Sequence, residues 1–316
     1  MVHFIRHCAT RTRLSVVLLV GWLGIALSKF SRWSRRLGTP HPHNGRIPRD
    51  FGREEEEKAQ ILAFHDLDPV EGYRRLADMM LDADVVAVSP SRVYRVLTAA
   101  GQLAPREGTP SQKGTGFEQP LRPHEHGHVD VSSLNICGTF FFLCRILDGS
   151  SRFVVHWEIR ETMQEAEVET ILQRARAQDP GEHPRIITDH GPQFIARDFK
   201  EFIRICGMTH VKTSPYYPQS NGKIERGFKT LKGECLRVTT PLSVEDARRW
   251  VAEFVTHYHT VRLQSAIADI TPADQLAGRA EAIWASRREK LAPADARRRA
   301  KAKEKELAQS RPAELE

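Results

Sequence analysis

The sequence predicts an α/β protein in which a mixed sheet with flanking helices follows an all-α region. Three observations lead to this prediction. Helix signals dominate residues 51–105, three strongly apolar strand-like segments succeed one another in residues 128–159, and helix and strand signals then alternate as far as residue 213. With 316 residues, the chain has room for two or three domains, one of them with a sizeable core.

Charge is distributed unevenly along the chain. The net charge is +7, yet residues 1–50 hold nine Lys and Arg against one acid, and residues 279–316 hold eleven against seven. The intervening residues are therefore net acidic. Basic ends around an acidic middle suit a protein that binds a polyanion with its ends; a basic surface kept for solubility is the alternative. The five cysteines include no C-x-x-C pair, which argues against a disulfide framework or a zinc site.

Residues 1–50 predict a basic helical segment. The apolar run 14–28 follows several arginines and so resembles a signal peptide. It is short for a membrane span and is interrupted by Gly21 and Gly24. We therefore expect a small helical module in a cytoplasmic, nucleoid-associated protein without a membrane partner.

Three helices are predicted in residues 51–105. They are expected over residues 54–64, over residues 68–81, and from Ser89 to just before Gly101. Asp68 and Ser89 each precede a proline, the arrangement of an N-cap followed by proline in the first turn.

The second and third of these helices form a helix-turn-helix candidate. In that arrangement Arg92 and Arg95 on the third helix would contact DNA. A plain helical hairpin that never contacts DNA is the alternative. Residues 106–120, which are polar and rich in Gly and Pro, are predicted to be a linker.

Residues 121–278 predict the α/β domain itself. Asp148-Gly149 marks a tight turn between the second and third strands. Three consecutive strands followed by alternating helices and strands is the order of a ribonuclease-H-like domain. The expected elements are strands over 128–134, 138–147 and 152–159, a helix over 162–177, a strand over 185–188, a helix over 194–205, a strand over 209–213, and a helix from about residue 221.

Three acidic residues are the candidate catalytic groups. Asp130 lies on the first strand, Asp189 just past the strand 185–188, and Glu225 on the last helix, with 35 residues between Asp189 and Glu225. Each has an ordinary alternative, as an exposed strand position, a turn aspartate or a solvated helix charge. Strand ends and a packed helix can bring three carboxylates together, and hard oxygen ligands suit Mg²⁺ ions for phosphodiester chemistry.

The motifs around these acids resemble a known family. The segments HVDVSSLN, IITDHGPQF and TSPYYPQSNGKIERGFKTLK are similar, in order, to blocks of the insertion-sequence transposases of the insertion-sequence-three type, which are related to retroviral integrases. The resemblance covers about three-quarters of the chain. Near the end of the core, Gln264, Ala268 and Asp269 depart from the family pattern.

This resemblance implies a DDE nucleotidyl transferase with an integrase catalytic core. Asp130, Asp189 and Glu225 would hold two Mg²⁺ (or Mn²⁺) ions. The implied reaction is DNA strand cleavage followed by strand transfer to a DNA 3′-hydroxyl, during transposition of an insertion sequence.

Five residues near Glu225 are candidate DNA contacts. Lys229 and Lys232 follow Glu225 by four and seven residues, which places them on its helix face. Tyr216 is expected to stack on an unpaired base, while Gln219 and Asn221 cap the helix or contact phosphate. A solvated helix face and a loop packed on its own domain are the alternatives.

The expected partners follow from the implied reaction. They are double-stranded DNA, both transposon ends and target, further copies of the chain in a synaptic complex, and the product of an upstream reading frame. The alternative functions are a ribonuclease-H-like nuclease and a catalytically silent DNA-binding protein derived from a transposase. The tail 279–316 is expected to be a solvated helix or a disordered basic segment.

Overall fold

The structure is a computed structural model that describes residues 1–38, 55–103, 119–213 and 222–309, with side chains as far as residue 304. The chain divides into two compact units. One is Glu54–Arg297, and the other comprises Met1–Arg53 together with Arg298–Glu316.

The N-terminal unit begins with a three-helix module, as expected for a helical segment. Its small apolar core consists of Val2, Ile5, Val20 and Phe30. No single helix of the described residues is long and apolar enough to cross a membrane; α2 and α3 meet that test only as a pair, bent by 116° between them. The helices are α1 (Val2–Thr12), α2 (Val16–Trp22) and α3 (Leu27–Arg35).

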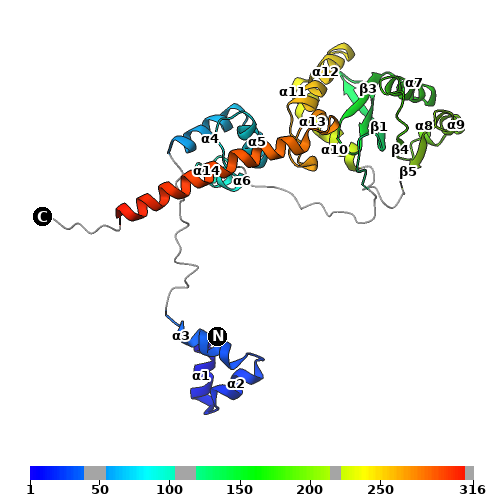
Figure 1. Ribbon diagram of the computed structural model, residues 1–316. Helices are drawn as coiled ribbons and strands as arrows, with labels where there is room; N and C mark the ends of the chain where they lie inside the picture. Colours follow the sequence, from blue (N-terminus) through cyan, green and yellow to red (C-terminus); the bar gives the residue numbers. More distant parts are fainter. Residues whose placement is uncertain (39–54, 104–118, 214–221, 310–316) are drawn as a thin grey trace. The chain divides into compact units, whose positions relative to one another are not determined.

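Three helices open the larger unit (Figure 1). The second begins later than predicted, because residues 68–71 form a tight turn in which Glu71 N donates to Asp68 O (3.2 Å). Gly72, not Asp68, is its N-cap. These helices share a core of buried residues that includes Leu76, Met80 and Val93. They are α4 (Glu55–Leu67), α5 (Tyr73–Asp82) and α6 (Pro90–Ala99).

The central sheet has five strands in the order β3-β2-β1-β4-β5. β1 pairs antiparallel with β2 and β2 with β3, whereas β4 runs parallel to β1 and β5 parallel to β4. This mixed topology confirms the predicted ribonuclease-H-like sheet with flanking helices. The strands are β1 (His126–Ile136), β2 (Thr139–Asp148), β3 (Val154–Arg160), β4 (Arg185–Thr188) and β5 (Thr209–Lys212).

Helices cover both faces of the sheet. Side chains alternate along a strand, so Val129 of β1 packs on one face and Leu134 on the other. The face that holds Val129 is covered by α7 (Glu165–Arg176), α8 (Pro192–Ile195) and α9 (Arg197–Ile205). The face that holds Leu134 is covered by α10 (Gly222–Leu231), the π-helical segment Lys232–Leu236 and α12 (Val244–Thr260). The short α11 (Arg237–Thr239), which has no buried residue, lies between the last two in the chain.

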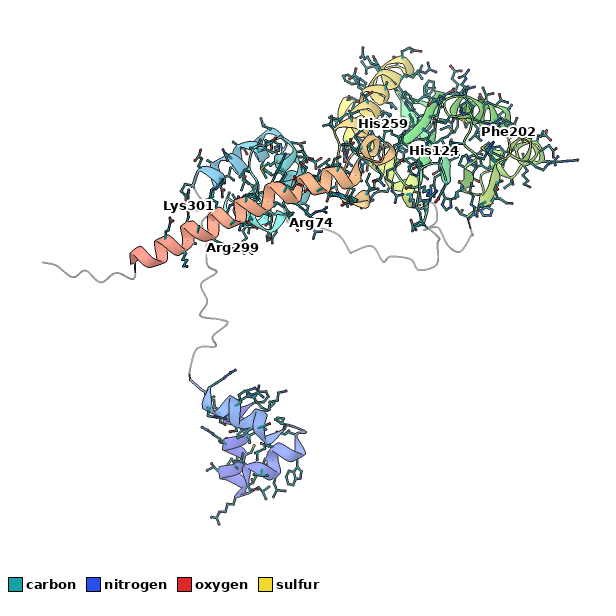
Figure 2. All side chains as sticks on the ribbon, in the orientation of Figure 1. Arg74, His124, Phe202, His259, Arg299 and Lys301 are labelled. Carbon is teal, nitrogen blue, oxygen red and sulfur yellow. The ribbon has the colours of Figure 1, made fainter. Side chains whose placement is uncertain are left out.

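Two predicted helices on the first face differ from the observed ones. The helix expected from residue 162 begins at Glu165, because the Glu167 carboxylate accepts the Gln164 N–H (2.6 Å) and closes a capping box. The single helix expected over 194–205 is two, since Ala196 is extended (φ −56°, ψ 152°) and the Glu165 carboxylate of α7 accepts the Phe199 N–H in the first turn of α9. Figure 2 shows Phe202 on α9 and His259 on α12.

The C-terminal region is helical, which is one of the two predicted alternatives. After α13 (Pro272–Leu276), α14 (Ala280–Gln309) is one long helix. Within the larger unit it docks on α5: the Arg287 Nε donates to Asp82 Oδ1 (2.8 Å) and the Lys290 Nζ to Leu81 O (2.7 Å). The first half of this helix therefore packs on α5, where the prediction had it in solvent.

Candidate active site

Asp130 occupies the middle of β1 on the sheet face that α10 covers. Its neighbours Val129 and Val131 pack on the opposite face, so strand alternation directs Asp130 toward α10. One carboxylate oxygen accepts the Val131 N–H (2.8 Å). The pKa of Asp130 is raised to about 6, mainly by burial and also by the negative charges of Asp189 and Glu225, against the opposing effects of the Val131 N–H and Arg145.

Asp189 follows β4, beside β1. The parallel register pairs His128 with Ile187, which brings Asp189 level with Asp130 two residues further along. The Asp189 Oδ1 accepts the Gly191 N–H (2.9 Å), so its carboxylate also closes the turn into α8. The sheet register therefore sets the separation of the two aspartates.

Glu225 lies in the first turn of α10 and is exposed. The helix packs on β1, and neighbouring Ile224 and Phe228 are buried in the core beneath it. Since Asp189 and Glu225 both act on the pKa of Asp130, the fold brings the three sequence-predicted acids into one electrostatic neighbourhood.

The fit of these residues to a divalent metal follows from their charge. Within the described ranges, no group of three His, Cys, Asp or Glu side chains is close enough together to hold a metal ion. The acids nevertheless supply three hard oxygen donors, and the half-buried Asp130 feels the negative charges of Asp189 and Glu225. A cluster of this kind fits Mg²⁺ or Mn²⁺, because a cation relieves both burial and like-charge repulsion.

The predicted lysine contacts differ in their surroundings. Lys229 is exposed, one helical turn after Glu225. Lys232 begins the π-helical segment and donates through Nζ to the Ser133 carbonyl (2.9 Å), and burial lowers its pKa. The amine of Lys232 thus ties the end of α10 to β1.

The other predicted DNA contacts lie on α6 or outside the described residues. On α6, Arg92 forms an ion pair with Asp295 of α14 (Nη1–Oδ1, 2.8 Å), while Arg95 is exposed. Tyr216, Gln219 and Asn221 fall in residues 214–221, outside the described residues.

One residue beside the site was missed at the sequence level. Arg145 lies in β2, directly opposite Asp130 in the antiparallel register, and is buried. Its only signal was a charge in the middle of the apolar run 138–147, which by itself does not say where the guanidinium points.

Comparison with known families identifies the domain that contains these residues. The family profile described as integrase core domain matches residues 120–218, and a second profile of the same description matches residues 206–272. Residues 120–272 of this chain are therefore similar to the integrase core domain. The matched region holds the whole sheet together with α7 to α12, and it contains Asp130, Asp189 and Glu225.

Curated relatives are insertion-element proteins, which confirms the predicted kinship with insertion-sequence transposases of the retroviral integrase superfamily. An uncharacterized 39.2 kDa protein of insertion element IS476 from Xanthomonas euvesicatoria is 27% identical over 208 residues, covering 64% of this chain and 59% of that protein. The InsD transposase of insertion element IS2 from Escherichia coli is 27% identical over 236 residues, covering 67% of this chain and 75% of that protein. This chain therefore spans just over half the length of the first relative.

Solved structures with similar folds are more distant. A simian T-cell lymphotropic virus intasome matches at 17% identity and a TM-score of 0.45, covering 68% of this chain and 74% of that chain. The HTLV-2 integrase catalytic core with magnesium matches at 18% and 0.40 (49% and 98% covered), and the Mos1 transposase catalytic domain at 16% and 0.39 (54% and 84% covered).

Proposed function

We propose that this protein is a DDE transposase, which cleaves DNA at the ends of an insertion sequence and joins the freed 3′-hydroxyl to target DNA. The observation that carries the proposal is that Asp189 and Glu225 both act on the charge of Asp130, in a region that matches the integrase core domain. Polynucleotidyl transfer is the general activity of that family; the assignment to these three acids is our inference.

Each acid has a distinct part in holding the ions. Asp130, on the central strand, is the fixed donor, because the sheet on both sides restrains β1. Asp189 is positioned by its own turn, and Glu225 approaches from the exposed start of α10. Two divalent ions held there would supply Lewis acidity to the scissile phosphate and its attacking and leaving oxygens.

Positive charge on the same helix face suits the DNA backbone. Lys229, exposed one turn after Glu225, is placed to contact a phosphate next to the cleavage point. We assign the backbone contact to Lys229 first, since the Lys232 amine already donates to Ser133. Because two DNA ends must be joined to one target, the active form is inferred to contain more than one copy of the chain.

The test is metal-dependent nicking and joining of a labelled duplex that carries the terminal repeats flanking this gene. With Mg²⁺ or Mn²⁺ the wild type should be active, and Asp130→Asn, Asp189→Asn and Glu225→Gln should each lose more than about a hundredfold, since even the outer partners of metal ligands contribute 10- to 100-fold. Duplex binding should persist in all three. Glu201→Gln, which alters an exposed carboxylate on α9, is the control and should retain activity.

Two outcomes would contradict the proposal. Strand transfer that survives in any of the three variants removes that residue from the site. Tight binding by the wild type without cleavage, even after addition of the upstream reading frame's product, would favour a silent DNA-binding protein.

A further inference from the structure

Arg145 is a charged residue among apolar neighbours on its face of β2. The strand alternates, so Leu143, Arg145 and Leu147 share the sheet face under α10, and both leucines belong to the apolar core there. Arg145 is only 1% exposed. Burying a guanidinium is costly unless its surroundings compensate, and an apolar side chain of similar size would fill this space without that cost.

The guanidinium contacts three residues on one face of α10, namely Ile224, Gly227 and Phe228. Its Nη2 donates to the Ile224 carbonyl (2.9 Å), the residue before Glu225. Its Cζ lies 4.6 Å from the centre of the Phe228 ring, a cation–π contact. Between them is Gly227, where any Cβ would overlap the Nη2, so a side chain at position 227 is incompatible with this packing.

The same guanidinium also affects Asp130 on β1. Arg145 pairs with Asp130 in the strand register, and its positive charge opposes the rise in the pKa of that carboxyl. Burial lowers the pKa of Arg145 to about 10, with Tyr258 and Asp130 opposing the shift, so the group stays charged at neutral pH. Among the described residues its Nε has no hydrogen-bond partner, which leaves the contacts to α10 as its main attachment.

We propose that Arg145 is a positioning residue for the metal-binding acids: it fixes the first turn of α10, and hence Glu225, against the strand that carries Asp130. This rests on the proposed function. Arg145 acts on the metal-binding acids indirectly, through its hydrogen bond to the Ile224 carbonyl and through its positive charge near Asp130. It is therefore not itself a catalytic group. Gly227 is the necessary complement, since it makes room for the guanidinium.

The test uses the full-length chain without DNA and has two readouts: Mn²⁺ affinity by calorimetry, and amide hydrogen exchange of α10. Arg145→Met keeps the length and apolar volume but removes the charge and the donors. It should weaken Mn²⁺ binding by about tenfold or more, the size expected for a residue that orients a metal ligand. It should also speed exchange in α10, while α7 on the other face stays protected. Arg145→Lys keeps the charge but loses the planar guanidinium. Its Mn²⁺ affinity and its α10 exchange rate should lie between those of the wild type and of Arg145→Met.

A matched control and a second variant keep the inference falsifiable. Arg248→Met removes another arginine that donates to a backbone carbonyl, that of Ile159, away from α10, and should change neither readout. Gly227→Ala should reproduce the effect of Arg145→Met by displacing the guanidinium, whereas Gly233→Ala, with no described atom within 4 Å of its added Cβ, should not.

The outcomes separate the two proposals. Unchanged Mn²⁺ affinity and unchanged α10 exchange in Arg145→Met overturn the positioning role and leave Arg145 as a space-filling residue. A wild type that binds Mn²⁺ but joins no DNA would contradict the proposed function alone, because both readouts are taken without DNA. If the wild type binds no Mn²⁺, the proposed metal site fails, and α10 exchange still decides whether Arg145 holds the helix.

Discussion

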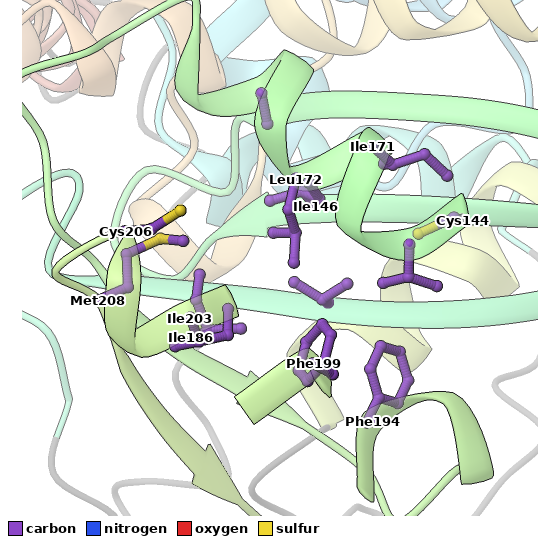
Figure 3. Close-up of a cluster of buried hydrophobic side chains, with 13 residues drawn as sticks. Cys144, Ile146, Ile171, Leu172, Ile186, Phe194, Phe199, Ile203, Cys206 and Met208 are labelled. Atoms are coloured by element: carbon purple, nitrogen blue, oxygen red, sulfur yellow. The ribbon is translucent and has the colours of Figure 1, made fainter. Parts of the chain in front are cut away.

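The two faces of the sheet differ in the side chains that they bury. The face under α7, α8 and α9 is an apolar core in which Phe194, Phe199 and Ile203 pack against Val129 and Ile146 (Figure 3). The face under α10 and α12 is apolar toward the far end of β1, around Leu134 and Ile136, but carries charged groups nearer its middle.

We infer from this difference that the first face mainly stabilises the fold, whereas the second also holds the candidate active site. On the first face, close packing of apolar side chains is the main source of stability. On the second, Asp130 and Arg145 replace apolar residues at the point where α10 crosses, and burial disfavours the charged form of both. Such a concentration of perturbed groups is typical of a functional site.

The largest expected effect tests the first face. Phe199 is fully buried in that core. Phe199→Ala should lower the free energy of unfolding by about 3–5 kcal/mol, the usual loss for a buried aromatic truncated to alanine. Urea unfolding followed by circular dichroism measures it. Phe140→Ala, at a position 61% exposed on β2, is the control and should stay within about 0.5 kcal/mol of the wild type. Equal losses in both would mean that the burial of Phe199 in this core adds nothing to stability.

A smaller effect tests the second face through pH. His259 of α12 is half-buried, its Nε2 accepts the Val154 N–H (3.0 Å), and it stacks on Phe153 with ring centres 3.7 Å apart. Burial lowers the pKa of His259 from 6.5 to about 4. Between these values the unfolded chain binds a proton that the folded chain does not, so stability is lost as pH falls from 6.5 toward 4.

The expected loss from this residue is about 1–2 kcal/mol after allowance for partial exposure. His259→Gln keeps an acceptor for the Val154 N–H but cannot be protonated, so its unfolding free energy should fall less steeply over this pH range. His257→Gln, at an exposed position of the same helix, should follow the wild-type curve. If His259→Gln also follows that curve, the acid sensitivity arises elsewhere.

Much of the fold follows from local patterns in the sequence. The apolar segments of β1 and β2, the turn at Asp148-Gly149 and the short buried strand before Asp189 each predict an element that is present. Helix starts were harder to predict, since the beginnings of α5 and α7 depend on the turn at residues 68–71 and on a carboxylate in the capping box.

Contacts between distant segments could not be predicted in the same way. The position of Arg145 under α10 requires knowing that β2 neighbours β1 and that residue 227 lacks a side chain. The pairing of Arg92 with Asp295 joins residues about 200 positions apart, although the sequence favoured a DNA contact for Arg92. Helical spacing alone treated Lys229 and Lys232 as equivalent, and the hydrogen bond from Lys232 to Ser133 distinguishes them.

The smallest expected effect decides between those two lysines. If the exposed Lys229 contacts a phosphate, Lys229→Met should weaken duplex binding to a similar extent for all sequences and reduce the slope of log affinity against log salt by about one. Lys232→Met should leave that slope unchanged, because its amine is already bonded to Ser133. Fluorescence anisotropy of a labelled duplex over a range of salt concentrations measures both. A slope that falls with Lys232→Met but not with Lys229→Met would mean that DNA displaces the Ser133 bond, and that DNA contact on this side of the sheet extends past α10 into the π-helical segment.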